Sequence, residues 1–549
     1  MKLSDYVVHF VADQGVRHVF LVTGGGAMHL NNSLADERRL VPVCNSHEQA
    51  SAICAEGYAK ATNHLGVCMV TTGPGGTNAV TGVAGAWLDS TPTLFISGQV
   101  KRPDRMFDKD GRPLGMRQLG VQEVDIVSIV KPITKYAVTV LDPNDIRYHM
   151  EKAVYLALHG RPGPVWIDIP LDVQASPIPD PSAMRAFDPA ELETKSAGSN
   201  LPAEVGQLIA KLNQAERPLL FAGNAVRLAH AEKEFEQLRT MLKIPTVATW
   251  CAADLVPSDD PAFVGRPGTV AARGANFALQ NCDLMLAIGV RLDFAITGYA
   301  PQNLAREAHK AAVDIDPAEL QKLHPYLQRP ICADARAFLV ELLRQKGSIR
   351  TREPGAWNAR CADWKMRYPV VTHEHRKPDS LVSIFNLAEV IGTESNPEDL
   401  LVSGSSGSGI EIFLLACPTR NGQRITILPV LGRWATACPC RWRSASAADM
   451  GERFWWTATA GFNSIFKNWR PPPGSTCPAA RYTRPQPETR NSSYGRLRKA
   501  GQVRGISQKD SELNRSQIQT EGEFAQRHYR WVNLLQTKCS CARGSRIGR

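Results

Sequence analysis

The sequence predicts an α/β protein built from repeated, doubly wound domains with parallel sheets. Short apolar runs that are typical of strands alternate with helical stretches over most of the first 425 residues. These runs are apolar on both faces, which indicates parallel strands covered by helices on two sides. Many of them end in Gly, Asp or Asn, as at the ligand-facing edge of an open parallel sheet.

Residues 1–175 are predicted to form the first domain. Apolar residues at positions 3, 6, 7, 10 and 11 follow the helical period, and Gly15 ends that helix. We expect the strands at 18–22, 41–45, 66–72, 92–98 and 164–170.

A Pro/Ser-rich linker leads to a second α/β domain at 190–350. Its expected strands are 217–223, 244–249, 282–289 and 310–316. The charged, Trp-rich stretch at 345–380 is interpreted as a further linker.

Residues 375–425 resemble the start of a third α/β unit, with a helix at 380–392 and a strand from 399. No clear strand–helix alternation follows in residues 426–549. We therefore expect this tail to be largely disordered and the strand at 399–405 to lack neighbouring strands.

Composition excludes several classes of protein. The chain has 549 residues, 43% hydrophobic and 21% charged, without an apolar run of 18 residues, so we expect no membrane span. The first helix is interrupted by charged residues and does not resemble a signal peptide. Thirteen cysteines without CxxC pairs favour a reducing, cytoplasmic location.

The net charge of +11 suggests nucleic acid as a partner, but its distribution argues against this. Residues 426–549 contain 21 Lys and Arg and 7 Asp and Glu, so the first 425 residues are slightly acidic. The tail also holds 6 of the 11 tryptophans and shows no periodic presentation of its bases. We expect no nucleic-acid partner.

Glu48 and three loops are the candidate site. Glu48 opens an Ala-rich apolar helix, where a carboxylate either complements the helix dipole or binds a ligand, and its position alone favours the dipole role. The loops can present backbone N–H groups to a ligand, or they can be plain turns, and each taken alone favours a turn. Their residues are Gly25 and Gly26 in the first loop, Pro74, Gly75 and Asn78 in the second, and Ser406, Gly407 and Ser408 in the third.

Several motifs in register change this balance, because together they resemble the thiamine-diphosphate-dependent enzymes, within them the acetolactate synthase large-subunit group. The resemblance covers roughly residues 1–425. The motifs are HEQAS around Glu48, the run 71–99, VQEVD at 121–125, GRPGPVWIDIP at 160–170 and VDIDPAEL at 313–320. The family has a pyrimidine-binding, a central and a diphosphate-binding domain.

The resemblance implies a catalytic role for Glu48. In the family this glutamate hydrogen-bonds N1′ of the aminopyrimidine and promotes loss of the thiazolium C2 proton, after which a 2-oxo acid such as pyruvate is decarboxylated. It places Gly75, Asn78 and Gln99 in the cofactor pocket. It also implies a homodimer or tetramer, because the pocket closes against the diphosphate domain of a second subunit.

The same resemblance implies FAD, which many members hold in the central domain without using it for redox chemistry. Arg161, Gly265, Gly268 and Asp316 would lie near it. Val270 and Ala271 stand where the group usually has His and Gly, so FAD stays open, and the GRPGP turn is equally compatible with a plain turn before a strand.

The family holds Mg²⁺ through a Gly-Asp-Gly element followed by Asn-Asn, and neither occurs after residue 400. We therefore expect no metal ligands in this chain. Instead, residues 457–471 are what the family peptide Asp-Gly-Asp-Gly-Gly-Phe-Gln-Phe-Asn-Ile-Gln-Glu-Leu-Glu-Thr gives when suitable codons are translated one nucleotide out of register. Thr459 then stands where the metal-binding Asp belongs. A genuine divergent tail is the alternative.

These observations predict an acetolactate-synthase-like carboligase whose reading frame shifts near residue 426. The chain as written is then catalytically impaired. The alternative is a non-catalytic remnant of the family that binds cofactor weakly or not at all.

Overall fold

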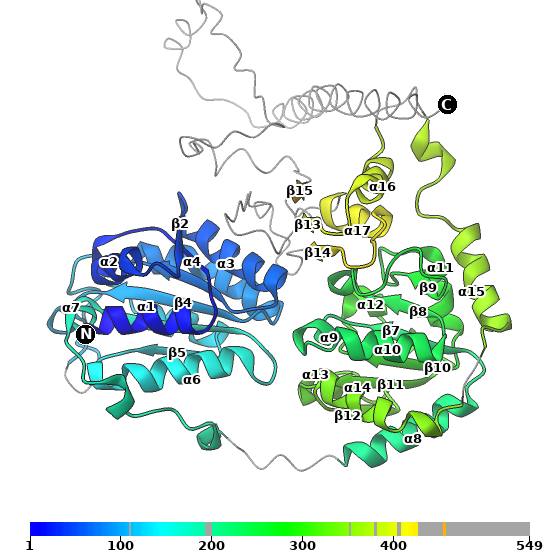
Figure 1. The fold of residues 1–549 in the computed structure, drawn as a ribbon, viewed down its shortest axis with the longest axis horizontal. Helices are drawn as coiled ribbons and strands as arrows, with labels where there is room; N and C mark the ends of the chain where they lie inside the picture. The colour runs from blue at the N-terminus through cyan, green and yellow to red at the C-terminus, as the bar shows by residue number, and fades with distance from the viewer. Residues whose placement is uncertain are drawn as a thin grey trace, which may run out of the picture.

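The structure is a computed structural model, and it describes residues 1–108, 111–192, 200–350, 353–377, 382–402, 408–426 and 454–456. Three parallel sheets follow one another along the chain. The first lies in the blue and cyan part of Figure 1, the second in the green part, and the third in the yellow part beside the second. The expected α/β class is confirmed.

The first sheet has six parallel strands in the order β2-β1-β3-β4-β6-β5. The strands are β1 (His18–Leu21), β2 (Val41–Cys44), β3 (Gly66–Val70), β4 (Thr93–Gln99), β5 (Tyr136–Thr139) and β6 (Pro164–Pro170). The helices are α1 (Leu3–Asp13), α2 (Met28–Asp36), α3 (Glu48–Thr62), α4 (Pro74–Leu88), α5 (Ile126–Val130), α6 (Ile146–Leu158) and α7 (Leu171–Ala175). The sequence analysis missed β5, whose four residues are all half-buried.

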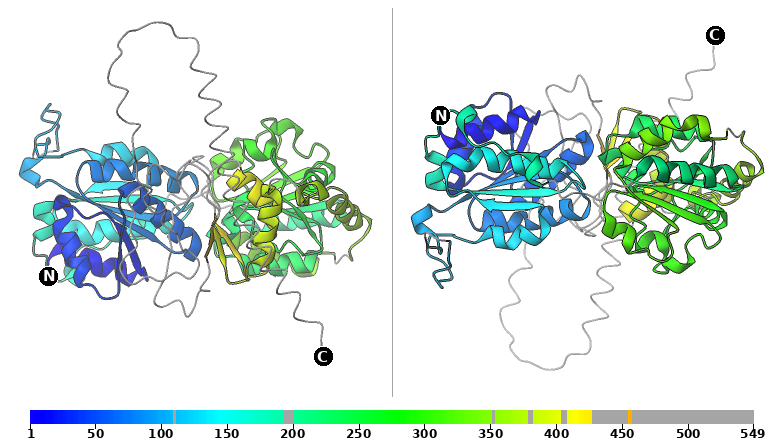
Figure 2. Two further views of the ribbon diagram at one scale, coloured as in Figure 1. Left: turned by 90° about the horizontal axis from the view of Figure 1, so that it is seen from above. Right: turned by 90° about the horizontal axis from the view of Figure 1, so that it is seen from below.

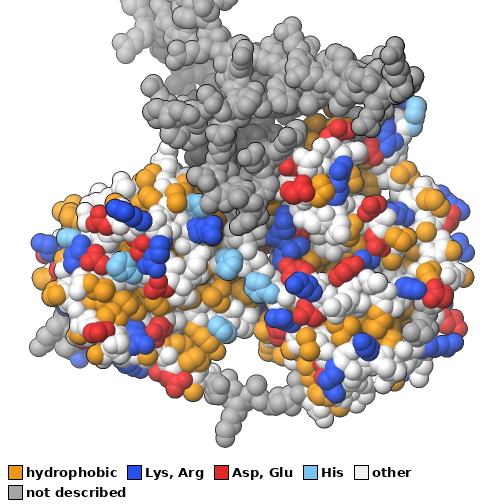
Figure 3. Space-filling view, viewed as in Figure 1, with side chains coloured by type: hydrophobic (Ala, Val, Ile, Leu, Met, Phe, Trp, Pro, Cys, Tyr) orange, Lys and Arg blue, Asp and Glu red, His pale blue; other side chains and the backbone are white. Residues whose placement is uncertain are grey.

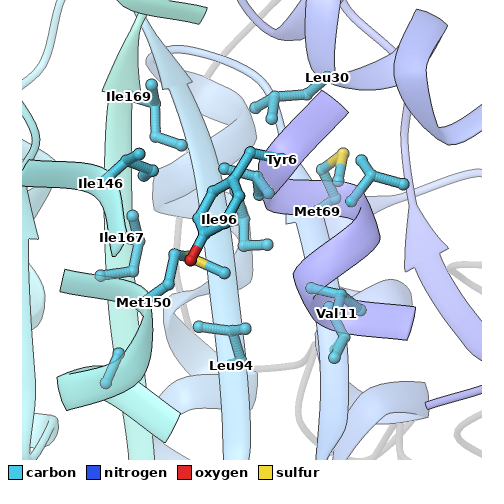
Figure 4. Packing of buried hydrophobic residues seen from close by; sticks show 14 of the residues in the cluster. Tyr6, Val11, Leu30, Met69, Leu94, Ile96, Ile146, Met150, Ile167 and Ile169 are labelled. Carbon is cyan, nitrogen blue, oxygen red and sulfur yellow. The ribbon is translucent and has the colours of Figure 1, made fainter. Parts of the chain in front are cut away.

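Alternate residues of the central strands enter two different hydrophobic clusters. On β4, Leu94 and Ile96 pack with α1, α2 and α6, whereas Phe95 packs on the opposite face, stacked on Trp166. Figure 4 shows the first of these clusters. Because both faces are buried, the strands carry unbroken apolar runs, which is the property that made them predictable.

The second sheet also has six parallel strands, in the order β12-β11-β10-β7-β8-β9. They are β7 (Pro218–Ala222), β8 (Thr246–Ala248), β9 (Phe263–Gly265), β10 (Leu284–Ile288), β11 (His309–Asp314) and β12 (Arg329–Cys332). The helices are α8 (Leu201–Gln214), α9 (Ala225–Leu228), α10 (Glu232–Leu242), α11 (Arg273–Asn281), α12 (Phe294–Thr297), α13 (Pro317–Gln321), α14 (Ala335–Arg344) and α15 (Ala356–Arg367). The edge strands β9 and β12 were not predicted.

The interpretation of 345–380 as a linker is wrong over α15. Trp357 and Trp364 of this helix pack edge to face, and the Trp357 Nε1–H donates to the Pro218 carbonyl at 3.0 Å. Both side chains lie against the core cluster that contains Cys361. Its tryptophans are therefore packing residues, and the helix caps one face of the second sheet.

The third sheet has three parallel strands in the order β14-β13-β15. Its elements are α16 (Ile384–Glu394), β13 (Leu400–Val402), the π-helical turn η11 (Ser408–Ile412), α17 (Phe413–Ala416), β14 (Arg424–Thr426) and β15 (Phe454–Trp456). The prediction that the strand from 399 lacks neighbours is wrong, because β14 and β15 pair with β13 on its two sides. The expected disorder of 426–549 falls, apart from Thr426 and β15, outside the described residues.

The first and second sheets lie side by side, as all three ribbon views show. Side chains join them directly. The Asn63 amide at the end of α3 donates to the Arg227 carbonyl at 2.9 Å, and Arg161 binds Asp316. The carboxyl ends of five strands of the second sheet face this junction, because residues at or just after these ends line a common cavity there.

Candidate active site

Glu48 is the first residue of α3, and three residues separate it from the end of β2. His47 precedes it as the N-cap, and its Nδ1 accepts from the Gln49 N–H at 3.1 Å. A carboxylate in the first turn is favoured by the unpaired N–H groups and the helix dipole. The dipole role considered for Glu48 is therefore available, and the side chain is half-buried, so a ligand could also reach it.

The structure brings Glu48, Gly75 and Asn78 together. The Asn78 Nδ2–H donates to Glu48 Oε2 at 2.9 Å, across the packed pair α3 and α4. A Cβ placed on Gly75 would lie 3.9 Å from Glu48 Oε1. Asn78 therefore holds one carboxylate oxygen, while the other lies close to Gly75.

Gly73 makes this turn possible. Its φ is +65°, and a Cβ at this position would approach the Gln122 carbonyl oxygen to 2.2 Å. Pro74 follows as the first residue of α4, where its missing N–H costs nothing. The turn therefore requires glycine for conformation and for the close approach of residues 121–125.

Gly25 and Gly26 form a short 3₁₀ turn after β1, held by residues that the sequence analysis did not name. The Gly26 N–H donates to Thr71 Oγ1 at 3.1 Å, and its carbonyl accepts from Gln174 Nε2 at 2.8 Å. A Cβ on Gly26 would collide with Thr72 Oγ1. Packing against the TTGPGG run thus explains why residue 26 is a glycine, whereas Gly25 faces open space. The threonines of that run were the feature of the sequence from which this contact could have been predicted.

Gln99 lies at the carboxyl end of β4 and is buried with Asp168 of β6. Its Nε2 donates to Asp168 Oδ2 at 3.2 Å, and Asp168 also accepts from Ser97 and Thr139. Burial raises the pKa of Asp168 to about 6, against the lowering effect of these hydrogen bonds. The resemblance pointed to Gln99 but not to its acidic partner.

The raised pKa of Asp168 predicts a pH dependence of stability. Between about pH 4 and pH 6 the folded chain holds a proton that the unfolded chain releases, so stability falls as the pH rises through this window. The contribution is about 3 kcal/mol, at roughly 1.4 kcal/mol for each unit of pKa. We expect the free energy of unfolding of Asp168→Asn, measured with urea, to lack the decline between pH 4 and pH 6 that the unmodified chain shows. Equal pH slopes in the two proteins would contradict this expectation.

The third predicted loop is mostly outside the described residues. Ser406 and Gly407 lie outside them, and Ser408 is described only as the start of η11. Within the described ranges, no group of three or more His, Cys, Asp or Glu side chains is arranged to hold a metal ion. Only the sequence therefore bears on the diphosphate half of the site.

A cavity of about 430 Å³ lies between the first two sheets. It is lined by residues at or just after the carboxyl ends of β7, β8, β10, β11 and β12, among them Asn224, Cys251, Gly289, Asp314 and Asp334. The strand order reverses between β7 and β10, and ligands of open parallel sheets bind at such a switch point.

Two of the four residues expected near FAD line this cavity. Arg161 and Gly268 are among the lining residues, whereas Gly265 and Asp316 are not. Instead, the Arg161 guanidinium donates to Asp316 Oδ2 at 2.8 Å and Glu319 Oε1 at 3.0 Å. Burial disfavours the charged guanidinium, but these two carboxylates outweigh it and raise the pKa of Arg161. Two residues that were expected to contact the flavin, Arg161 and Asp316, thus form an ion pair with each other across the domain junction.

Acidic and basic side chains are intermingled over the face of the described residues shown in Figure 3. No helix among the described residues is both long and apolar enough to cross a membrane. The positive excess noted in the sequence belongs to residues 426–549, nearly all outside the description.

Comparison with known proteins identifies the first two domains. Residues 1–129 match the thiamine pyrophosphate enzyme N-terminal TPP binding domain, and residues 205–342 match the central domain of the same enzymes. The chain therefore carries two domains of the thiamine pyrophosphate enzyme family, as the motifs predicted.

Among these enzymes, the chain is similar to acetolactate synthase large subunits. It is 32% identical to a probable large subunit from Methanocaldococcus jannaschii over 401 residues, which are 71% of this chain and 64% of the relative. It is 36% identical to the isozyme 2 large subunit of Escherichia coli over 378 residues, 67% of this chain and 64% of the relative. The match to the large subunit of Corynebacterium glutamicum is 33% over 413 residues, 74% and 62%. The matched region thus spans less than two thirds of these relatives.

Proposed function

We propose that this chain derives from a thiamine-diphosphate-dependent, acetolactate-synthase-like enzyme that decarboxylates a 2-oxo acid such as pyruvate and transfers the two-carbon unit to an acceptor. The observation that carries the proposal is the contact of Glu48 with Asn78 beside the glycine turn. These residues fit an aminopyrimidine, because a half-buried carboxylate with one oxygen held by an amide can share a proton with a ring nitrogen.

Thiamine diphosphate, when bound, supplies the electron sink for decarboxylation. Glu48 would hold or release a proton at the pyrimidine N1′, and Asn78 would keep its carboxylate in place. The names of the relatives support the reaction class, while the acceptor and the pathway stay open.

We further propose that the chain acts as a homodimer or tetramer in which the diphosphate domain of one copy closes the Glu48 pocket of another. In this chain that domain is the altered one, because the Gly-Asp-Gly and Asn-Asn elements are missing from the sequence after residue 400. Catalysis by the chain as written is therefore impaired in every subunit, and the second candidate is a non-catalytic remnant. A titration of the frame-restored protein with thiamine diphosphate and Mg²⁺ separates the two: saturable, Mg²⁺-dependent binding supports the enzyme, and its absence supports the remnant.

We propose the cavity between the first two sheets as the site for FAD. Its walls are backbone turns at the carboxyl ends of parallel strands, which suits a dinucleotide. Arg161 would contribute its charge at the rim. Gly268 has a φ of +142°, and a Cβ there would meet the Ala295 carbonyl oxygen at 2.8 Å, so this part of the wall requires glycine. Val270 and Ala271 do not line the cavity, so their departure from the family pattern does not close it.

The FAD proposal predicts that the purified chain binds FAD and quenches its fluorescence. Ile315, a half-buried residue of the cavity wall, can be replaced by Trp to fill part of the space. We expect Ile315→Trp to weaken FAD binding at least about tenfold, since the added ring occupies the ligand volume. Tyr326→Trp, an exposed change outside the wall, is the control. Equal affinities for Ile315→Trp and the control would place the flavin elsewhere.

A further inference from the structure

A buried carboxylate lies behind the glycine turn without a charged hydrogen-bond partner. Asp168 is 1% exposed, and its Oδ1 accepts from Ser97 Oγ at 2.6 Å. Its Oδ2 accepts from Thr139 Oγ1 at 3.1 Å and from Gln99 Nε2 at 3.2 Å. All three partners are neutral donors, and they reach both oxygens of the side chain, so the arrangement needs an acceptor at each of the two positions. A carboxylate accepts at both oxygens, whereas an amide accepts at one and donates at the other.

Both N–H groups of the Gln99 side-chain amide donate to protein acceptors. Besides Asp168, the Gln99 Nε2 donates to the Val124 carbonyl at 2.9 Å, and the Gln99 Oε1 accepts from the Val100 N–H at 3.0 Å. An amide has two N–H donors, and both are occupied. Gln99 therefore joins Asp168 in the sheet to Val124 in the following loop.

Val124 ends a loop that is closed on itself. The buried Glu123 carboxylate accepts from the N–H groups of Met106, Leu119 and Gly120. The next residue back, Gln122, has a φ of +63°, and its carbonyl lies against Gly73. The loop is thus pressed onto the turn that leads to Gly75 and Glu48.

We propose that Asp168 is a positioning residue that acts through Gln99 to hold residues 119–124 against the Gly73–Gly75 turn, so that the turn keeps its place beside Glu48. This inference rests on the proposed function for its catalytic meaning. Gln99 is, in this arrangement, the link and not a donor to the cofactor. Loss of either side chain frees the loop and then the turn.

Hydrogen–deuterium exchange on the full chain without cofactor tests the inference. In Asp168→Asn we expect the Leu119 and Gly120 amides and the 121–124 segment to exchange about tenfold faster, as befits loss of a hydrogen bond to a charged group. Gln99→Met removes both donors at similar volume and should give the same result. Ser97→Ala is the control. It removes the hydrogen bond that Ser97 donates to the same carboxylate and the one that it accepts from the Trp166 Nε1–H, without touching Gln99.

Each variant is measured at the urea concentration that gives it the same global free energy of unfolding as the others. Faster exchange in Asp168→Asn and Gln99→Met but not in Ser97→Ala, with no further increase in the double variant Asp168→Asn/Gln99→Met, supports positioning through Gln99. Equal acceleration in all three single variants, or none in Gln99→Met, would overturn it. A thiamine diphosphate titration of the same samples tests the proposed function separately, since the exchange measurement requires no cofactor.

Discussion

Inserting one nucleotide near codon 426 is expected to turn an inactive chain into a carboligase. The protein as written, assayed with pyruvate, thiamine diphosphate and Mg²⁺, should form acetolactate or acetoin no faster than a Glu48→Gln control. The insertion restores the Gly-Asp-Gly element in place of 457–461 and with it the carboxylate that Thr459 replaces. The change should be the largest of those predicted here, from background to ordinary turnover.

The physical reason is the desolvation of the diphosphate. A phosphate anion taken out of water needs compensating charge, and Mg²⁺ with oxygen ligands from Asp and Asn supplies it. A threonine hydroxyl offers the metal a neutral ligand in place of an anionic one. The Gly/Ser loop at 403–409 contributes hydroxyl and backbone groups only, so it does not balance the charge.

Two further proteins serve as controls for this prediction: one with a three-nucleotide insertion, and the unmodified chain. An insertion of three nucleotides at the same codon lengthens the chain without changing the frame, and it should leave the protein inactive. Clear turnover by the unmodified chain would show instead that residues 426–549 build a working diphosphate site, and the shifted-frame interpretation would then be wrong.

Glu48→Gln in the frame-restored protein is expected to lower turnover by about 10²–10⁴-fold, the usual contribution of a positioned proton-transfer group. Gln keeps the volume and can still accept from Asn78, but it cannot exchange a proton with a ring nitrogen. Because Glu48 is half-buried at a helix start, the substitution should change the melting temperature little.

The matched control is Asp36→Asn at the end of α2, a carboxylate whose partner in the described structure is Asn32. It loses one negative charge from the same domain, and its turnover should be unchanged. If Glu48→Gln retained full turnover, the HEQAS motif and the contact with Asn78 would have to serve packing alone.

Sequence alone determined the α/β class and the strands that are buried on both faces. These strands carry uninterrupted apolar runs, as in β3, β4, β7 and β10, and such runs leave a signal that needs no knowledge of neighbours. The short strands β5, β9 and β12 escaped detection: they lie at sheet edges, where pairing on one side is enough. The same limit applies to α15, whose charged composition hides two tryptophans that pack into the core.

Within the candidate site, the resemblance to the thiamine-diphosphate-dependent enzymes identified Glu48, Gly75 and Asn78, whereas their local patterns alone favoured a helix start and a plain turn. Only the tertiary structure decided how they meet and what supports them. Asp168 is 69 residues from Gln99 along the chain, and the Arg161 and Asp316 pair is separated by 155 residues. Such contacts depend on which strands become neighbours and how two domains dock, and these are properties of the folded chain that no local pattern of side chains records.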